Sequence, residues 1–524
     1  MKAMTLGAIA EATGGTLVDG AAAHTVVSGS VEFDSRKVGD GGLFVAIPGA
    51  RVDGHDFSEQ AIAKGAVAML GAHPTGVPAV IVPKVDAAAA AESGAANAEA
   101  FANDPTGEVR AVITGLSNLA RANTDALTAT NRKHPLTVIG VTGSAGKTST
   151  KDFIATVVGQ VGTTVAPPGS FNNEIGHPYT ALRCDEDTRF LVSELSARGI
   201  GHIAYLARIA PPRIGAVLNV GTAHLGEFGS RENIAKAKGE LVEALPSAAD
   251  GGVAILNGDD PLVAGMAERT QAKVLYFSVH DPDHAGRPVE AHPDPEVYAT
   301  DVQLDAMARA SFTLHLPNSD PQLVSLQVYG AHQVSNALAA AAVGRALGLD
   351  ARAIARALSS HTAQSVNRMD VRTREDGVTI INDSYNANPD SMRAGIAALA
   401  TTAAGRRKLG SAGDPEGGRS WALLGKMGEL GGKSAEEHEA LGEVLRDAQI
   451  DRLVAIGEGK DVEALERGAR AQGITTMAVS SVAEAVDLLS QELQPGDVVL
   501  VKASYVDGLW RVAEGLLPGP RGEK

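Results

Sequence analysis

The stretch GVTGSAGKTSTK, residues 140–151, follows an apolar run and leads into a segment that favours a helix. Small residues in such a turn let backbone N–H groups approach phosphate oxygens, and a helix beginning near Thr148 points its positive end at the same place. We therefore expect a phosphate-binding loop between a strand and a helix, in which Lys147 contacts the terminal phosphates and the Thr148 hydroxyl reaches Mg²⁺. An ordinary glycine turn is the alternative, which a Gly-Lys-Thr triplet straight after an apolar strand disfavours.

This loop departs from the strict pattern of its class, because five residues rather than four separate Gly140 from Gly146. The residues that we expect to contact the nucleotide are Gly143, Ser144, Ala145, Gly146, Lys147, Thr148 and Ser149. A loop that binds nucleotide phosphates also needs metal ligands close by.

Two residues that follow other strand-like runs are candidates for the metal site. Glu194 lies near the end of RFLVSEL (189–195), and His224 lies in NVGTAHLGEFGS (219–230). Taken alone, either residue would more often be a structural or surface group. Ligands collect at the carboxyl ends of strands in open α/β sheets, and this shared position favours a role in metal binding.

The chain of 524 residues is too long for one ordinary domain, and its apolar runs predict three α/β domains. Residues 1–105 combine strand-like runs at 43–47 and 79–83 with an alanine-rich stretch at 87–102 that favours a helix. They predict a small α/β domain.

Residues 106–362 form the second predicted domain, which opens with a helical pattern at 112–127. Its expected strands are LTVIGV (136–141), RFLVSEL (189–195), IGAVLNV (214–220) and GVAILN (252–257), before a surface excursion at 280–296, a strand-rich stretch to Val328 and a helix at 336–349. Such alternation predicts a mostly parallel sheet that is covered by helices on both faces.

Residues 363–524 form the third predicted domain, in which strands and helices alternate again. Its expected strands are VTIINDS (378–384), WALLGKM (421–427), RLVAIG (452–457) and DVVLVKAS (497–504). The glycine-rich, charged run GRRKLGSAGDPEGGRS (405–420) is expected to be a mobile loop.

Composition argues against several classes of partner. Lys and Arg total 46 against 62 Asp and Glu, a net charge of −16, and without a basic run no nucleic acid is expected. A single cysteine, Cys184, cannot form an internal disulfide framework and fits a reducing compartment. There is no secretory signal pattern and no window of the roughly 18 apolar residues that a membrane span needs. We expect a soluble, cytoplasmic protein.

These motifs together resemble the Mur ligases, over nearly the whole chain. The phosphate loop has the family's form. Other similar segments are NVGTAHLGEFGSRENIAKAKGEL (219–241), LNGDDP (256–261), YGAHQVSNALAAAA (329–342), NRMDV (367–371), INDSYNANPDSM (381–392) and LLGKMGELG (423–431). The resemblance implies a UDP-binding first domain, a P-loop ATPase-like second domain and a Rossmann-like third domain that closes over the site.

The resemblance also implies ATP and two Mg²⁺ ions as cofactors. The residues that match the family's contacts to phosphate, Mg²⁺ and ATP are Lys147, Thr148, Glu194, His224, Asn336, Arg368 and Asp383. The family's carbamylated lysine matches Lys238, whose CO₂ adduct would be a carboxylate able to hold a second Mg²⁺. Without its flanking sequence, Lys238 would be read as an ordinary solvated lysine of a helix.

Three segments indicate which reaction the resemblance implies. FDSRKVGDGGLFVAIPGARVDGHDF (33–57) is similar to the uridine-nucleotide-binding domain of the ligases that add the third residue or the final dipeptide, which makes Ser35 and Arg36 candidate substrate contacts. FNNEIGHP (171–178) and DSYNANPDSM (383–392) resemble the dipeptide-adding member, and the matched substrate contacts are Asn172, Asn173, Asn386 and Asn388. The implied partners are UDP-N-acetylmuramoyl-tripeptide and D-alanyl-D-alanine, joined by a monomeric enzyme through an acyl phosphate.

Two other functions stay open at this point. A sister ligase would add the third-position diamino acid, and a nucleotide-switch ATPase would form no covalent product. The sequence departs from the family at Lys426, where an acidic residue is frequent, and at Tyr505, where arginine is frequent. The segment SELSARGIGHI (193–203) also diverges after its glutamate. Contacts to the incoming dipeptide are therefore the weakest part of the match.

Overall fold

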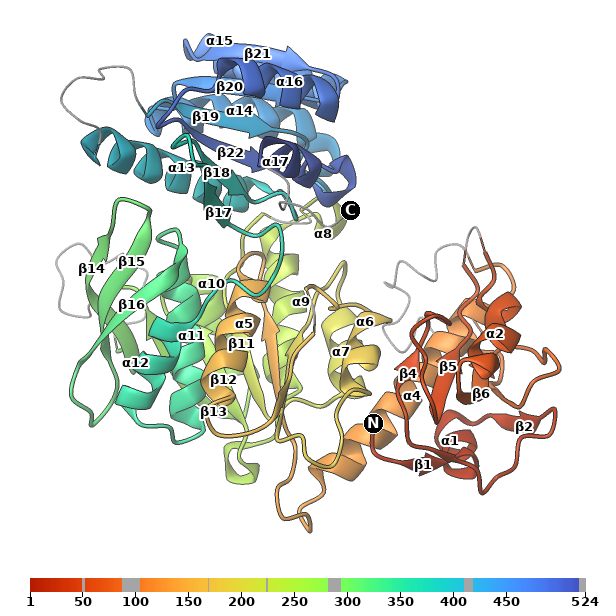
Figure 1. Cartoon of the computed structure of the whole chain (residues 1–524). Coiled ribbons are helices and arrows are strands. Elements are labelled where there is room, and N and C mark those ends of the chain that lie inside the picture. The colour runs from red at the N-terminus through yellow and green to blue at the C-terminus, as the bar shows by residue number, and fades with distance from the viewer. Residues whose placement is uncertain are drawn as a thin grey trace.

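The computed structural model describes residues 1–49, 52–86, 104–167, 169–222, 225–280, 294–409 and 418–517. Within these residues, sheets of five, nine and six strands follow one another along the chain, each with its own helices (Figure 1). The α/β architecture is the one that the sequence predicts. The domain boundaries expected at residues 105 and 362 remain predictions.

The first sheet has the order β2-β7-β6-β5-β4, and its pairs are parallel except for β2 at one edge. Its elements are α1 (Leu6–Thr13), β2 (Thr16–Val18), β4 (Val31–Glu32), β5 (Gly42–Val45), η1 (Gly54–Phe57), α2 (Ser58–Ala63), β6 (Ala66–Gly71) and β7 (Ala79–Ile81), beside a ladder of β1 (Met4–Thr5) with β3 (Val26–Val27). The strands expected at 43–47 and 79–83 are confirmed. The helix expected at 87–102 lies outside the described residues.

The long helix α4 (Glu108–Thr128) joins the first sheet to the second. It packs against α1 and also against α6 (Gly176–Ala181) and α7 (His202–Ile209). The Ser117 hydroxyl lies 3.1 Å from the Tyr205 hydroxyl, and the Asn123 amide donates to the carbonyl of Cys184 at 3.1 Å. The helix predicted at 112–127 is therefore confirmed. Its buried polar side chains Ser117 and Asn123 find their partners in Tyr205 and Cys184, which follow β8 (Thr137–Thr142) in the chain.

The second sheet has nine strands in the order β16-β15-β14-β13-β12-β11-β8-β10-β9, parallel from β9 to β14 and antiparallel beyond. Its strands are β8 (Thr137–Thr142), β9 (Thr164–Val165), β10 (Phe190–Glu194), β11 (Ile214–Val217), β12 (Val253–Asn257), β13 (Lys273–Ser278), β14 (Val297–Leu304), β15 (Arg309–His315) and β16 (Gln322–Tyr329). Besides α6 and α7, the α-helices of this part of the chain are α5 (Lys147–Val158), α8 (Leu225–Phe228), α9 (Arg231–Glu243), α10 (Pro261–Ala264), α11 (Gln333–Ala346) and α12 (Ala351–Ser360).

Helices cover both faces of this sheet because successive side chains of each strand enter different cores. Ile139 and Val141 of β8 pack with α5 and α11 in one core. Val138 packs with α4, α7 and α9 in the other. Because β8 is buried on both faces, packing on both sides fixes the position of its carboxyl end.

The third sheet has the order β17-β18-β22-β19-β20-β21, with β17 antiparallel at one edge. Its elements are β17 (Asp370–Thr373), β18 (Thr379–Asn382), α13 (Pro389–Leu409), β19 (Ser420–Leu424), α14 (Ser434–Asp447), β20 (Arg452–Ile456), α15 (Lys460–Ala471), β21 (Thr475–Val479), α16 (Val482–Glu492), β22 (Val498–Lys502) and α17 (Trp510–Leu516). The four strands expected here are confirmed. The edge strands β17 and β21 were not predicted, because neither contains a fully buried residue.

The loop expected at 405–420 is wrong at its beginning, because α13 continues to Leu409. Arg406 donates to the Thr373 hydroxyl at 2.7 Å, and Arg407 donates to the Gly418 carbonyl at 2.9 Å. These contacts hold the last turn of the helix against the sheet. Residues 410–417 lie outside the described part of the chain.

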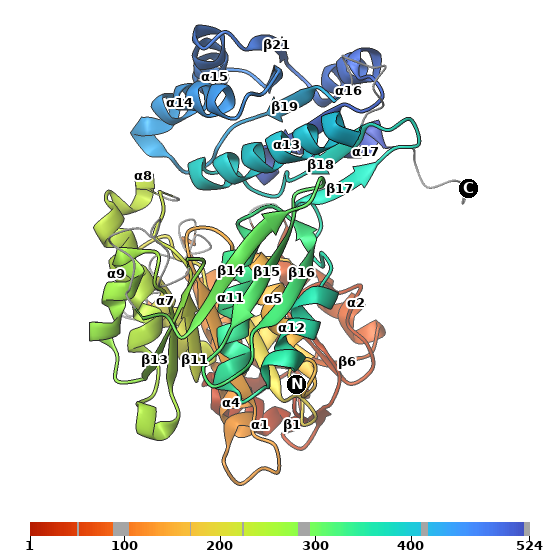
Figure 2. The same ribbon diagram turned by 90° about the vertical axis from the view of Figure 1, so that its left-hand side faces the viewer.

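The β14–β15 turn of the second sheet lies against α13 of the third (Figure 2). A Cβ atom on Gly405 would come within 2.1 Å of the Ala306 carbonyl oxygen, so glycine is needed for this approach. No helix among the described residues is long and apolar enough to cross a membrane.

The third sheet should depend on the buried carboxylate of Asp497, which is 0% exposed. It accepts hydrogen bonds from Arg419 Nη2 at 2.6 Å and from the Trp421 indole at 3.1 Å. Asp497→Ala leaves both donors without this acceptor, and we expect a loss of about 3 kcal/mol in the free energy of unfolding. Tryptophan fluorescence during denaturation measures this locally, because Trp421 and Trp510 are the only two tryptophans.

Asp447→Ala is the matched control, since Asp447 pairs at 2.7 Å with the half-exposed Arg446 on the surface of the same domain. An exposed pair of this kind contributes under about 1 kcal/mol. Equal losses in the two variants would contradict the role assigned to Asp497.

Candidate active site

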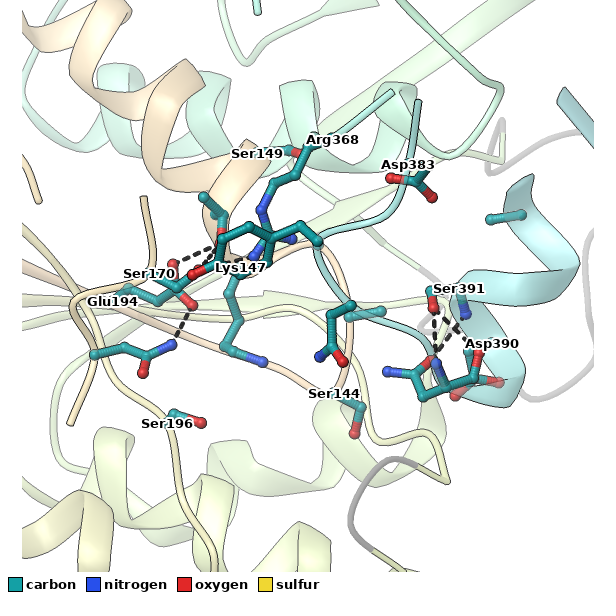
Figure 3. Close-up of a pocket in the computed structure, with 18 of the residues that line it drawn as sticks. Ser144, Lys147, Ser149, Ser170, Glu194, Ser196, Arg368, Asp383, Asp390 and Ser391 are labelled. Carbon is teal, nitrogen blue, oxygen red and sulfur yellow. Dashed lines mark hydrogen bonds between the residues drawn. The ribbon is translucent and has the colours of Figure 1, made fainter. Parts of the chain in front are cut away.

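A polar cavity of about 820 Å³ lies between the carboxyl edge of the second sheet and the third domain. Its walls combine the loop after β8, the segment before α6, the end of β10, the start of α11 and residues near β18 and β22. Figure 3 shows Lys147, Glu194 and Arg368 close together, with Asp390 and Ser391 at the start of α13. Residues far apart in sequence therefore form one site.

The predicted phosphate loop has the expected geometry. β8 ends at Thr142, and α5 begins at Lys147, one residue before the predicted helix start. The Lys147 ammonium donates to the Gly143 carbonyl at 2.8 Å. Of the predicted nucleotide contacts, those from Ser144 to Ser149 line the cavity, whereas Gly143 does not.

Glycine at position 146 is required by the backbone and by a neighbour. Its φ is +82°, and a Cβ atom there would lie 2.5 Å from the Asn336 side-chain oxygen. The same oxygen accepts from the Thr150 hydroxyl at 3.1 Å, and the Asn336 amide donates to Gln333 at 2.9 Å. Asn336 therefore holds the loop from α11 and faces the cavity, as a predicted nucleotide contact should.

Glu194 lies beside the loop because β10 is parallel to β8 and pairs Glu194 with Val141. Its carboxylate accepts from the Thr148 hydroxyl at 2.8 Å and from the Asn172 amide at 2.7 Å. The carboxylate and the hydroxyl are hard oxygen ligands of the kind that Mg²⁺ prefers. His224, the other predicted metal ligand, lies outside the described residues.

Lys238 lies on α9 and is buried, at 4% exposure, rather than solvated as an isolated helix lysine would be. It does not line the cavity itself, and it makes no hydrogen bond or ion pair with the described residues. Burial, followed by the charge of Lys147, lowers the pKa of Lys238 well below its ordinary value. The amine therefore loses its proton more readily than that of a solvated lysine.

Arg368 and Asp383 bring the third domain to the cavity, as predicted. The Arg368 guanidinium donates to the Ser170 hydroxyl at 2.7 Å and stacks 4.0 Å above the Tyr385 ring. Asp383 accepts from the Lys502 ammonium at 2.6 Å. Lys502 is 1% exposed and was missed from the sequence, although a lysine that ends the apolar strand β22 was a usable signal.

The four asparagines expected to contact substrate all line the cavity, but the side chains of two of them also accept from backbone N–H groups at the starts of helices. Asn173 accepts from the Gly176 N–H at 2.9 Å at the start of α6. Asn388 accepts from the Ser391 N–H at 2.9 Å at the start of α13. Asn172 is bonded to Glu194, and the carbonyl of Asn386 accepts from Lys502 at 2.9 Å.

Ser35 and Arg36 do not line this cavity. The Ser35 hydroxyl is buried and donates to Gln60 at 2.7 Å, and Arg36 pairs with Asp34 at 2.9 Å on the surface. Both belong to the first sheet's domain, where a uridine nucleotide was expected. Their role in substrate binding remains a prediction.

The two positions that depart from the family pattern lie beside the cavity. Lys426 is close to the half-buried Asp507, whose pKa is raised by partial burial although the Lys426 backbone and charge oppose the shift. Tyr505 is 54% exposed, and its ring centre lies 5.4 Å from that of Tyr385. Position 505 thus presents an aromatic ring where the family often has a cation.

Direct contacts hold the third domain against the second, and none was predicted. The Thr222 N–H donates to Asp390 at 3.1 Å, and Arg198 pairs with Glu429 at 3.4 Å. A Cβ atom on Gly226 would lie 2.7 Å from the backbone nitrogen of Gly431, so these segments are in close backbone contact. The two domains are therefore closed on the cavity.

Three family models match consecutive parts of this chain. Residues 29–119 match the catalytic domain of the Mur ligase family, residues 141–344 the Mur ligase middle domain, and residues 367–505 the glutamate ligase domain of Mur ligases. The UDP-N-acetylmuramoyl-tripeptide--D-alanyl-D-alanine ligase of Mycobacterium leprae is 48% identical, over 98% of both chains.

Solved structures agree with these matches. A MurF structure from Acinetobacter baumannii is 26% identical with a TM-score of 0.78, covering 98% of this chain and 99% of that one. The MurF ligase of Thermotoga maritima, solved in complex with ADP, is 27% identical with a TM-score of 0.71, covering 94% and 97%. The similarity thus spans all three sheets and includes a nucleotide-bound relative.

The loop geometry makes Gly146→Ala a test of nucleotide binding. We expect at least a tenfold loss of ATP affinity by calorimetry, because the new methyl group would displace Asn336 and strain a backbone whose φ is +82°. Gly348→Ala is the control: its φ is +81°, but nothing lies within 4 Å of the new Cβ. Similar affinity in the two variants would contradict the loop assignment.

Proposed function

Because this chain belongs to the Mur ligase family, we propose that it is an ATP-dependent ligase that joins D-alanyl-D-alanine to UDP-N-acetylmuramoyl-tripeptide. The product is the UDP-linked pentapeptide of peptidoglycan synthesis. Similarity over the whole length to the Mycobacterium leprae ligase of that name carries the proposal. The cavity supports it, because a nucleotide loop, a carboxylate and groups from the third domain share one space.

The relative's name also favours the dipeptide-adding reaction over addition of the third-position diamino acid. A nucleotide switch that forms no covalent product would need only the phosphate loop. It would leave unexplained the polar wall made by Asn172, Asn386 and Asn388 around that loop.

In this reaction the terminal carboxylate of the tripeptide attacks the γ-phosphorus of ATP, and an acyl phosphate and ADP result. The amine of D-alanyl-D-alanine then attacks the acyl carbon, loses a proton, and phosphate leaves. Lys147 and the N-terminus of α5 would offset the charge on the phosphoryl group during its transfer. Asn336, from α11, and Arg368, which lies just before β17, would contact ATP from two different parts of the cavity wall.

The residues present fit Mg²⁺. Thr148 and Glu194 supply a hydroxyl and a carboxylate beside the loop, and His224 is the further ligand that the sequence predicts. Bound Mg²⁺ would neutralise phosphate charge in this site. A second ion needs another carboxylate, and among the predicted ligands that group would be a carbamate on Lys238.

Two observations support a carbamate on Lys238. The residue is buried with no ion pair among the described residues, and its lowered pKa favours the neutral amine that can add CO₂. Carbamylation places a negative charge close to Lys147. The adduct would therefore attract the Lys147 ammonium as well as supply a metal ligand.

Closure of the third domain serves the same chemistry. An acyl phosphate is lost if water reaches it, so the contacts Thr222–Asp390 and Arg198–Glu429 would keep the two domains together while the amine attacks. We infer a cytoplasmic enzyme, where ATP is available, and the monomeric state stays a prediction.

Mass spectrometry tests the proposed function. Incubation with UDP-N-acetylmuramoyl-tripeptide, D-alanyl-D-alanine and ATP should give the UDP-linked pentapeptide and one phosphate per peptide bond. Lys147→Ala should form none, because the phosphoryl charge would lose its nearest cation. Rapid phosphate release without any pentapeptide would overturn the ligase assignment in favour of a simple ATPase.

Lys238→Ala should lose nearly all turnover at physiological Mg²⁺ while keeping its thermal stability, because removing an unpaired buried amine deletes no charge-stabilising contact. Short carboxylates such as formate or acetate should restore part of the rate by occupying the gap, and chloride at equal ionic strength should not.

Lys238→Arg is the matched variant, since it keeps the positive charge but cannot form the CO₂ adduct under these conditions. We expect it to be as inactive as Lys238→Ala. Wild-type turnover by Lys238→Arg would contradict the carbamate.

A further inference from the structure

The segment before α6 carries a serine hydroxyl that the steps above do not use. Ser170 lines the cavity and is half-buried. Its hydroxyl oxygen lies 3.0 Å from that of Thr148 in the phosphate loop, and it accepts a hydrogen bond from Nη2 of Arg368 at 2.7 Å. Ser170 therefore connects the phosphate loop directly to a residue of the third domain (Figure 3).

The direction of these hydrogen bonds follows from the groups that make them. An arginine side chain can only donate, and each hydroxyl has one proton to give. The Thr148 hydroxyl donates to the Glu194 carboxylate at 2.8 Å, so Ser170 is the donor in its contact with Thr148. The hydrogen bonds thus run in one direction, from the guanidinium through two hydroxyls to the carboxylate. In such a chain each bond strengthens the next one, because every hydroxyl both accepts and donates.

A buried lysine fixes the backbone before Ser170 to the helix that follows the phosphate loop. Lys151 of α5 is 1% exposed, and its ammonium donates to the carbonyls of Pro167 at 2.7 Å and Gly169 at 3.3 Å. It also pairs with its neighbour Asp152 at 2.7 Å. Ser170 is thus connected to α5 through its own hydroxyl and through the chain that precedes it, so we expect it to move with the phosphate loop.

The third domain holds Arg368 from the other side. Its two neighbours have left-handed backbones, with φ of +59° at Asn367 and +48° at Met369, which residues other than glycine seldom adopt. The Tyr385 N–H stabilises this shape by donating to the Asn367 carbonyl at 3.0 Å. The Met369 N–H donates to the Asp383 carboxylate at 3.2 Å. Arg368, whose guanidinium also stacks on the Tyr385 ring, is therefore expected to move with the third domain.

We propose that Ser170 is a positioning residue that couples the occupied phosphate loop to closure of the third domain. Nucleotide binding orders Thr148 and the start of α5, Ser170 presents its hydroxyl to Arg368, and the third domain is held over the acyl phosphate. The proposal rests on the proposed ligase function and adds to it a residue that keeps water out during amine attack. Without this hydroxyl, water adds to the acyl phosphate and splits it into tripeptide carboxylate and phosphate, and no peptide bond forms.

The first measurement is the number of phosphates released per pentapeptide, in a matched pair of variants. Ser170→Thr keeps the hydroxyl, whereas Ser170→Val has the shape of threonine without it. We expect about one phosphate per peptide bond in Ser170→Thr, as in the wild-type enzyme, and at least about two in Ser170→Val. Ligation by Ser170→Val should also be roughly tenfold slower, as for the loss of one hydrogen bond to a charged group.

Hydrogen exchange provides a second measurement that needs no turnover. A non-hydrolysable ATP analogue should slow exchange at the N–H groups of Met369 and Tyr385 in the wild-type protein, because both groups hold the linker that presents Arg368. Mass spectrometry of peptides that contain these residues follows the exchange. In Ser170→Val the analogue should still bind, as calorimetry measures, but exchange at both N–H groups should not slow.

Ser117→Ala is the control. The Ser117 hydroxyl is buried and also connects two elements, through the Tyr205 hydroxyl at 3.1 Å, but it does not line the cavity. Its loss should leave the phosphate ratio and the nucleotide-dependent exchange unchanged, even if the melting temperature falls. Ser170→Ala replaces Ser170→Val if the valine variant does not fold.

A ratio of about one phosphate per peptide bond, with wild-type slowing of exchange, in folded Ser170→Val or Ser170→Ala would overturn the coupling and leave the ligase function intact. A lower nucleotide affinity with an unchanged ratio would overturn it too, because Ser170 would then serve the nucleotide site alone. Absence of any pentapeptide from the wild-type enzyme would instead count against the ligase function itself.

Discussion

The parallel pairing of β8 with β10 on one side and β11 on the other is the constraint on which the site depends. It puts Thr142 beside Val217 and Glu194 beside Val141, so that three strands end at one edge of the sheet. The phosphate loop, the carboxylate and the segment that contacts the third domain then follow within a few residues of that edge. A shift of one residue in this register would turn Glu194 to the opposite face and separate it from Thr148.

The cavity is complete only when the third domain lies against this edge. Arg368 reaches Ser170 from beyond the end of the second domain, and Asp390 accepts from the backbone of Thr222. Both of these contacts are polar, unlike the packing in the cores of the domains themselves. An interface of this kind can open and close, which suits an enzyme that must admit a large nucleotide-linked substrate and then exclude water.

The fold and the phosphate loop could be predicted because local signals determine them. Apolar strands that alternate with helices specify a parallel sheet, and the glycines around Lys147 specify a loop that follows a strand. Lys502 was missed although it ends an apolar strand, because its importance comes from burial and from its partner Asp383, which is distant in sequence. The end of α13 was misread because a glycine-rich and basic run is typical of loops, whereas the partners that extend the helix, such as Thr373, belong to another strand.

Three lysines near the nucleotide site, of which Lys502 and Lys238 are buried, show how the site is prepared for its substrates in a chain of net charge −16. Lys502 is compensated by Asp383, and Lys147 donates to a backbone carbonyl and faces the space for phosphate. Lys238 has neither kind of partner among the described residues, and a buried ammonium without one is unfavourable. Loss of the proton removes this unfavourable charge, and the resulting neutral amine can react with CO₂. The Lys147 ammonium and the Lys238 amine are thus groups that nucleotide and metal would satisfy, so binding energy is spent where the chemistry needs order.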